Sequence, residues 1–101
     1  MHLVQILLPL QDNQGRPLSH ALFAQVREEL VERFGGLTAY TRAPASGVWQ
    51  EGGEKQRDDI VVYEVMDDAL DRGWWTACRK GLEQRFAQEE VVVRAQEMQR
   101  L

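Results

Sequence analysis

The chain has 101 residues, 44% of them hydrophobic and 28% charged, and a formal net charge of −4. This length fits a single domain, residues 1–101, with one modest core. Acidic residues outnumber basic ones and no cluster of Lys and Arg is present, which argues against a nucleic-acid-binding protein. The apolar opening MHLVQILLPL is too short to span a membrane and lacks the basic start of a signal peptide. With Cys78 as the single cysteine, these features favour a cytoplasmic protein.

The first half of the chain predicts a strand, a helix and a second strand. Residues 2–8 are short and apolar, and the proline that follows them stops the strand because it cannot donate to a β-ladder. Ser19 is a suitable N-cap for a helix, and the pair Gly35-Gly36 ends it. Residues 37–43 then read as a strand, and residues 47–50 either add a short strand within the long connection that follows or belong to its loop. The apolar stripe of the helix consists of Leu22, Val26, Leu30 and Phe34.

The second half predicts a strand, a helix and a last strand. Residues 60–66, IVVYEVM, form the clearest strand in the chain. Asp67 or Asp68 is expected to cap a helix that continues to about Gln88, because a carboxylate is favourable at the positive end of the helix dipole. Residues 90–96 follow as a strand.

The second helix contains two glycines, two tryptophans and the single cysteine. Gly73 and Gly81 weaken a helix, so we expect them where the helix approaches the sheet closely. Trp74 is predicted in the core stripe, whereas Trp75 lies at its margin, where it packs or lines a cavity. Cys78 lies on the apolar side without a neighbouring histidine, which is typical of an inert buried thiol.

The order of these elements is β-α-β-β-α-β. With short links and right-handed crossovers, this order predicts a four-stranded antiparallel sheet with both helices on one face. The expected class is therefore an α+β, ferredoxin-like domain.

The face of the sheet away from the helices is predicted to be half apolar. Side chains alternate along a strand, so each strand divides into two faces. The apolar members of the open face are Leu3, Leu7, Ile60, Val62, Met66 and Val92. Its polar members are Gln5, Tyr40, Arg42, Glu64, Arg94 and Gln96, which we expect to pair with one another or across a two-fold axis. A contiguous apolar patch of this kind usually marks an interface, so we expect a homodimer formed through the sheet faces.

Three short motifs suggest a family. They are FGGLT at residues 34–38, GVW at residues 47–49, and RF followed by Q, E and V within residues 85–91. In this layout the chain resembles small bacterial proteins of the dimeric α+β barrel superfamily, and within it an uncharacterised family. The resemblance implies the ferredoxin-like fold and a dimer. It implies no mechanism, because the superfamily includes monooxygenases, isomerases, haem enzymes and proteins without known activity.

The residues that would carry these activities are not matched. Haem-degrading relatives use a histidine of a helix as an iron ligand, but the histidines here are His2 at a strand start and His20 at a helix start. The single asparagine, Asn13, lies in a loop and does not match the Asn, Trp and His set of the monooxygenase-like relatives. No His/Cys pair has the spacing of metal ligands and no phosphate loop is present, so we expect no metal and no cofactor.

Five residues are the candidates for ligand binding: Tyr40, Arg42, Trp49, Tyr63 and Glu64. Trp49 lies in an unusually long connection between the two middle strands, where it either stacks over a ligand or packs against the sheet edge or a partner subunit. Tyr40, Arg42 and Glu64 form either an acid–base and anion-binding group or an interface ion pair. Tyr63 faces the helices, where it hydrogen-bonds a ligand or serves as a core tyrosine.

Two functional hypotheses follow. In the first, the protein binds a small, partly apolar molecule in a cavity between sheet and helices or at the dimer seam, and the question of catalysis stays open. In the second, it is a non-enzymatic structural or interaction module whose open sheet face serves only dimerisation. A ligand-sized cavity lined by the candidate residues would favour the first.

Overall fold

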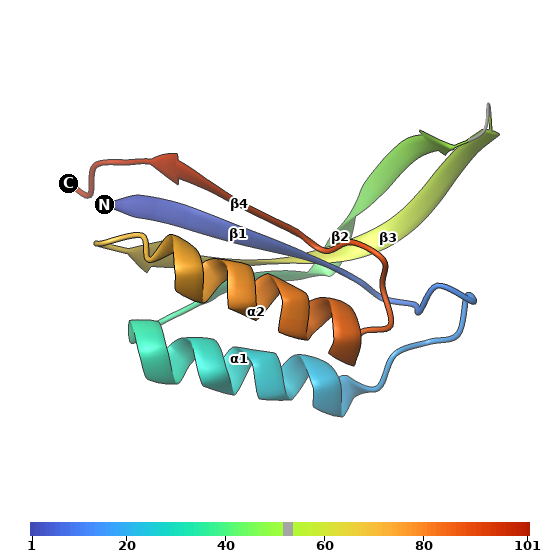
Figure 1. The fold of residues 1–101 in the computed structure, drawn as a ribbon, viewed down its shortest axis with the longest axis horizontal. Helices are drawn as coiled ribbons and strands as arrows, with labels where there is room; N and C mark the ends of the chain where they lie inside the picture. Colours follow the sequence, from blue (N-terminus) through green and yellow to red (C-terminus); the bar gives the residue numbers. More distant parts are fainter. Residues whose placement is uncertain (52–53) are drawn as a thin grey trace.

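The computed structural model describes residues 1–51 and 54–101, with side chains described outside residues 42–59. Its elements are β1 (His2–Pro9), α1 (His20–Phe34), β2 (Thr38–Glu51), β3 (Glu54–Asp67), α2 (Arg72–Arg85) and β4 (Val92–Glu97). The four strands form one sheet in the order β2-β3-β1-β4, and every neighbouring pair is antiparallel. Both helices cover one face of this sheet (Figure 1). The predicted α+β, ferredoxin-like arrangement is therefore confirmed.

The core lies between the helices and the two central strands. Alternate residues of β1 and β3 point into it, as the sequence pattern predicts. The buried strand residues are Val4, Ile6, Leu8, Val61, Tyr63 and Val65, and the buried helix residues are Phe23, Val26, Leu30, Trp75 and Leu82. The two edge strands are covered less completely, because Ala39 of β2 and Ala95 of β4 are exposed on the helix side.

The ends of α1 follow local chemistry. The Ser19 hydroxyl accepts a hydrogen bond from the Ala21 N–H at 3.1 Å, which satisfies one of the unpaired donors of the first turn. Gly35 ends the helix with φ +80°, and its N–H donates to the Val31 carbonyl at 2.8 Å. Both predicted helix boundaries are confirmed.

The predicted start of α2 is wrong. The N-cap is Asp71, whose carboxylate accepts from the Trp74 N–H at 3.0 Å. Leu70 has φ +24°, a conformation that interrupts any helix begun at Asp67 or Asp68. The Asp67 carboxylate instead accepts from the Trp75 indole N–H at 2.8 Å.

This shifted start decides which tryptophan enters the core. Trp75, seven residues before Leu82, lies on the same side of the helix and is buried, whereas Trp74 is half-buried. The Arg33 guanidinium lies 4.1 Å from the Trp74 ring centre, as expected for a cation–π contact at the surface. The assignment of Trp74 to the core and Trp75 to its margin is therefore reversed.

The explanation offered for the two glycines of α2 is also wrong. A Cβ atom built on Gly81 would meet no other atom within 4 Å, and one on Gly73 would meet only Asp71 Oδ1, at 3.5 Å. Close packing against the sheet therefore does not require glycine at either position.

The long connection between the middle strands is itself β-structure. β2 and β3 continue as a paired arm, with Ala45 opposite Ile60 and Glu51 opposite Glu54, and the arm extends beyond the body of the domain (Figure 1). The register shifts between Tyr40 and Ala45. Pro44 lies within this irregular stretch, where a missing backbone N–H costs no ladder hydrogen bond.

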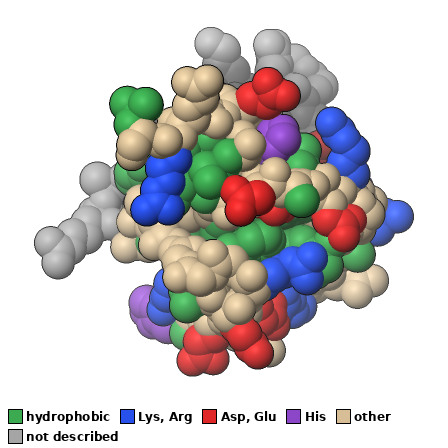
Figure 2. Space-filling view, turned by 90° about the vertical axis from the view of Figure 1, so that its left-hand side faces the viewer, with side chains coloured by type: hydrophobic (Ala, Val, Ile, Leu, Met, Phe, Trp, Pro, Cys, Tyr) green, Lys and Arg blue, Asp and Glu red, His purple; other side chains and the backbone are tan. Residues whose placement is uncertain are grey.

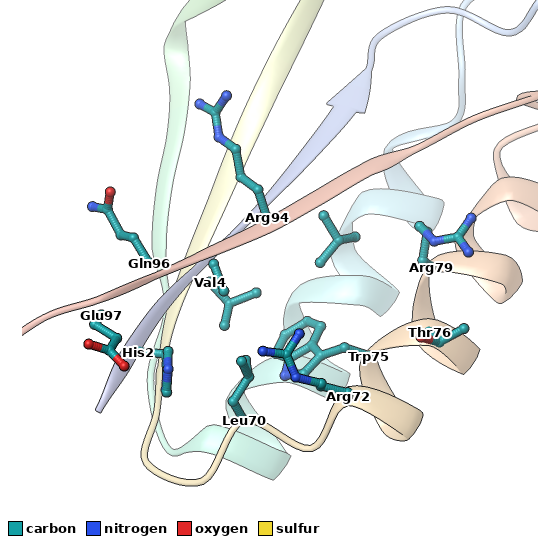
Figure 3. Close-up of a pocket in the computed structure, with 12 residues that line it drawn as sticks. His2, Val4, Leu70, Arg72, Trp75, Thr76, Arg79, Arg94, Gln96 and Glu97 are labelled. Carbon is teal, nitrogen blue, oxygen red and sulfur yellow. The ribbon is translucent and has the colours of Figure 1, made fainter.

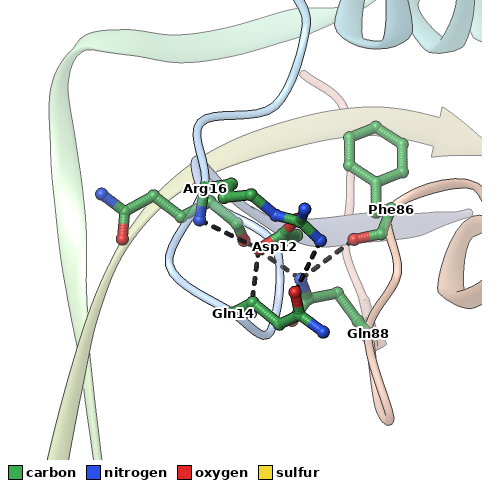
Figure 4. A network of polar contacts seen from close by, with 6 residues as sticks. Asp12, Gln14, Arg16, Phe86 and Gln88 are labelled. Carbon is green, nitrogen blue, oxygen red and sulfur yellow. Dashed lines mark hydrogen bonds and ion pairs between the residues drawn. The ribbon is translucent and has the colours of Figure 1, made fainter.

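The loop between β1 and α1 is held by a polar network (Figure 4). The Asp12 carboxylate accepts from the backbone N–H groups of Gln14 and Arg16 at 2.8 and 2.9 Å. These hydrogen bonds, that of Arg16 first, lower the pKa of Asp12. The Gln88 side chain donates to the Gln11 carbonyl at 3.0 Å and so connects this loop to the end of α2.

The surface is mixed in charge. Acidic, basic and hydrophobic side chains are interspersed on the end of the molecule that carries both termini (Figure 2). None of the helices in the described part of the chain is long and apolar enough to cross a membrane.

Candidate functional site

Four polar side chains form a continuous row across the open face of the sheet, one from each strand. The Tyr40 hydroxyl donates to Glu64 Oε2 at 3.2 Å, and the Gln5 amide donates to Glu64 Oε1 at 2.6 Å. Arg94 Nε in turn donates to Gln5 Oε1 at 2.8 Å. The strand register explains the row, because Gln5 lies directly opposite both Glu64 and Arg94. We call Tyr40, Glu64, Gln5 and Arg94 the polar row.

The polar row holds its tyrosine in the protonated form. The negative charge of Glu64, together with its hydrogen bond, raises the pKa of Tyr40 above the usual value of a phenol. At neutral pH the hydroxyl is therefore a hydrogen-bond donor rather than a phenolate base. The predicted pairing among polar members of the open face is confirmed for these four residues, although the sequence names only Tyr40 and Glu64 among them as ligand-binding candidates.

Apolar side chains flank the polar row on both sides. Leu3 lies opposite Met66, and Leu7 lies opposite Val62 on one strand and Val92 on the other. Met66 and Val92 are each 44% exposed. The predicted division of the open face into apolar and polar members therefore holds for the residues whose side chains are described.

Tyr63 lies apart from the polar row, on the opposite face of the sheet. Its side chain is fully buried, and its hydroxyl accepts a hydrogen bond from Arg27 Nη1 at 2.9 Å. This geometry corresponds to a core tyrosine with its hydroxyl at the edge. The side chains of Arg42 and Trp49 lie outside the described residues. The backbone of Trp49 is in the arm, opposite Gln56.

A cleft of about 410 Å³ opens between α2 and β4 (Figure 3). This volume lies within the roughly 300–1,000 Å³ that is common for small-molecule sites. We call it the α2–β4 cleft. Its lining residues are His2, Val4, Leu70, Arg72, Trp75, Thr76, Arg79, Val93, Arg94, Ala95, Gln96 and Glu97.

The cleft exists because α2 leaves one end of β4 uncovered. Val93 is half-buried and Ala95 is exposed, although both lie on the helix side of the sheet. The floor is apolar, with Val4 from the central strand and Trp75 from the helix. Of the predicted ligand-binding residues whose side chains are described, Tyr40, Tyr63 and Glu64, none lines the cleft. The one sequence signal that pointed to it was the suggestion that Trp75 lines a cavity.

His2 contributes an unusual group to this cleft. Its Nδ1 atom is buried and has no hydrogen-bond partner among the described residues. Buried polar atoms are nearly always paired with protein, water or a ligand, so an unpaired one requires an explanation. It is the only such side-chain atom in the part of the structure that is described.

The remaining candidates offer little chemistry. Burial raises the pKa of the Cys78 thiol, which keeps it protonated and a poor nucleophile. Within residues whose side chains are described, no group of three or more His, Cys, Asp or Glu could hold a metal ion.

Comparison with known proteins supports the fold. No protein-family profile matches the chain, and no curated protein matches it significantly. Among solved structures, it is similar to a phage SAM lyase in complex with S-methyl-5'-thioadenosine, with a TM-score of 0.63 and 19% identity over 95% of this chain and 80% of the other. A phage SAM lyase in the apo state gives a TM-score of 0.63 and 17% identity, over 94% of this chain and 78% of the other. At this identity the likeness establishes the shared fold alone.

Proposed function

We propose that the protein binds a small, partly apolar molecule, and that the α2–β4 cleft is the binding site. The observation that carries the proposal is the cleft itself, in which walls rich in polar side chains surround an apolar floor. In sites for small molecules, apolar surface supplies affinity and polar groups fix the orientation, and this cleft offers both, with the larger share polar.

The first test is to look for a bound molecule and then to block the cleft. Native mass spectrometry of the protein purified from cells would report any small mass that it retains. Binding of added compounds is then followed by the NMR signal of the Trp75 indole N–H, a group that lies at the cleft. S-methyl-5'-thioadenosine belongs among these compounds, since a structural neighbour binds it.

Ala95→Phe places a bulky ring in the cleft and should abolish binding. Ala39→Phe is the matched control, because Ala39 is also an exposed alanine on the helix side of an edge strand, at the other side of the sheet. Retention of the ligand by the Ala95→Phe variant, or equal loss in both variants, would refute the cleft as the binding site.

The open sheet face supports a second proposal, that two copies of the chain associate through it. Exposed apolar side chains beside a hydrogen-bonded polar row are suited to burial against a second protein surface. Under the first hypothesis, this association forms the dimer seam beside a ligand-binding protein. Under the alternative, in which the protein is a structural or interaction module, the association is its whole function.

The charges of the polar row specify how two copies would meet. Arg94 and Glu64 lie on the strands on either side of Gln5, so the row is positive at one end and negative toward the other. A two-fold axis that runs parallel to the strands reverses the row. It therefore places Arg94 over Glu64 of the second copy, with Gln5 near the axis. An axis along the row would instead place arginine over arginine, which electrostatic repulsion disfavours.

A charge exchange tests this arrangement. Arg94→Glu and Glu64→Arg should each weaken self-association, and the double variant should restore it, as followed by analytical ultracentrifugation across protein concentrations. Lys80→Glu changes the charge equally on an exposed position of α2 and should have no effect. A wild-type protein that stays monomeric at high concentration, or a double variant that is no better than the singles, would contradict the proposal.

A further inference from the structure

The helix wall of the α2–β4 cleft carries a stripe of hydrogen-bond donors. Arg72, Thr76 and Arg79 all line the cleft, and their spacing of four and three residues places them on one side of α2. Figure 3 shows all three on the helix side of the cleft, with Arg72 beside Trp75. Two arginines and a threonine therefore stand on the helix side of the cleft.

These positive groups are only partly neutralised by the protein. Arg72 has no hydrogen bond or ion pair among the side chains that are described. Arg79 uses a single nitrogen, Nη1, for both oxygens of Glu83, at 3.1 and 3.0 Å. Its other nitrogens have no partner in the described part of the chain.

The neighbouring acidic groups are mostly engaged elsewhere. The Asp67 carboxylate accepts from the Trp75 indole, and that of Asp71 from the Trp74 N–H. Glu97 lines the opposite wall beside His2. The donors of Arg72 and the remaining donors of Arg79 are thus available to a ligand.

Arg94 does not add to this wall. It lines the cleft at β4, but its guanidinium turns to the open face, where it donates to Gln5. In Figure 3 its side chain extends away from the other lining residues. The cleft therefore has one basic wall, formed by α2, and an apolar floor.

We propose that the ligand of the cleft carries one oxyanionic group, a carboxylate or a phosphate monoester, attached to an apolar body. Arg72 and Arg79 bind the oxyanion, because planar guanidinium groups match the geometry of both anions. Leu70, Trp75 and Val93 contact the apolar body. This inference rests on the proposed function, since it names the class of molecule that the same cleft binds.

A set of probes that share one ring and differ in charge tests the proposal. The probes are 1-naphthylacetate and 1-naphthyl phosphate as anions, 1-naphthylacetamide as the neutral analogue and 1-naphthylmethylamine as the cation. Each is titrated into the labelled protein, and the NMR signals of the Trp75 indole N–H and the arginine Nε–H groups are followed. We expect at least one anion to bind about tenfold more tightly than the amide, as for a hydrogen bond to a charged group. The comparison of the two anions identifies the oxyanion.

Variants then assign the preference to the helix wall. Arg72→Gln should remove most of the preference for the anion and leave the affinity for the amide unchanged. Arg72 has no described partner, so this change is not expected to disturb the fold. Lys80→Gln is the matched control, because Lys80 is on the same helix but does not line the cleft, and it should change neither affinity.

The outcomes separate this inference from the proposed function. If the amide binds in the cleft as tightly as both anions, the preference for an oxyanion is wrong and the binding site stands. If the anion preference survives in Arg72→Gln and in Arg79→Gln, the assignment of these arginines is wrong. If no probe shifts the Trp75 signal and the Ala95→Phe variant behaves like wild type with every compound, the proposed function fails as well.

Discussion

Tyr63→Phe separates a core role of Tyr63 from a role in ligand binding. The substitution keeps the buried ring and removes only the hydroxyl that accepts a hydrogen bond from Arg27 Nη1 at 2.9 Å. A hydrogen bond to a charged group contributes about 1.5–3 kcal/mol to stability. Arg27 is only half-buried and can turn toward water. The loss should therefore lie near the lower end, about 1.5 kcal/mol.

Urea unfolding and calorimetry measure this loss directly. For a domain of this size, about 1.5 kcal/mol corresponds to a decrease in Tm of roughly 6–12 °C. A double-mutant cycle with Arg27→Met should give a coupling energy of about 1 kcal/mol, because the two groups contact each other. Ligand binding at the α2–β4 cleft should not change. A loss of stability below about 0.3 kcal/mol, or weaker ligand binding at unchanged stability, would refute the assignment of Tyr63 to the core.

Three further predictions follow from the described contacts. Gly81→Ala should raise the free energy of unfolding by about 1 kcal/mol, because alanine is the better helix former and its Cβ atom would meet no other atom within 4 Å. Urea unfolding measures the change, and a loss of stability would indicate a packing constraint at this position. Glu83 accepts from the Val91 N–H and from Arg79, and these contacts, that of Val91 first, lower its pKa in the folded state. Its contribution to stability is thus present above pH about 4.5 and is lost as the pH falls through the lowered pKa, so Glu83→Gln should flatten the acid limb of the stability–pH profile. His2→Phe removes the buried, unpaired Nδ1 and should stabilise the protein by about 1 kcal/mol. The same change should weaken ligand binding. A loss of stability would show that this nitrogen has a partner.

The sequence predicts the fold well where local signals and burial agree. The alternating pattern of β1 and β3, the Ser19 cap and the Gly35 terminus each act through a few neighbouring residues, and all are found. The prediction for the start of α2 is wrong because three aspartates, Asp67, Asp68 and Asp71, precede it closely, and any of them could serve as a cap. The backbone conformation of Leu70, which the sequence does not show, decides in favour of Asp71.

The arm was predicted only in part, for a different reason. Pro44, Gly47, Gly52 and Gly53 are residues that usually mark loops. Here the proline coincides with a register shift, and the glycine pair separates β2 from β3. A ladder between polar strands has no apolar alternation, so the sequence predicts at most a short strand at residues 47–50 and not the full length of the arm.

The candidate site could be predicted only in part. The pairing of Tyr40 with Glu64 follows from side-chain alternation and strand order, both of which the sequence provides. The α2–β4 cleft depends on how far α2 extends over the edge strand, which is a tertiary property. Arg72 and Arg79 read from the sequence as ordinary exposed positions of a helix, and only the position of β4 gives them a shared space.

β4 is the element on which the two proposals meet, and its alternation makes them separable. Val93 and Ala95 face the cleft, whereas Val92 and Arg94 belong to the open face of the sheet. Ala95→Phe should therefore change ligand binding and leave self-association intact, and Arg94→Glu should do the reverse. A variant that alters both would mean that the edge strand itself has moved, because β4 is held in the sheet by β1 alone. In that case the ligand and the second copy would be coupled through one strand, and each would change the affinity for the other by the same factor.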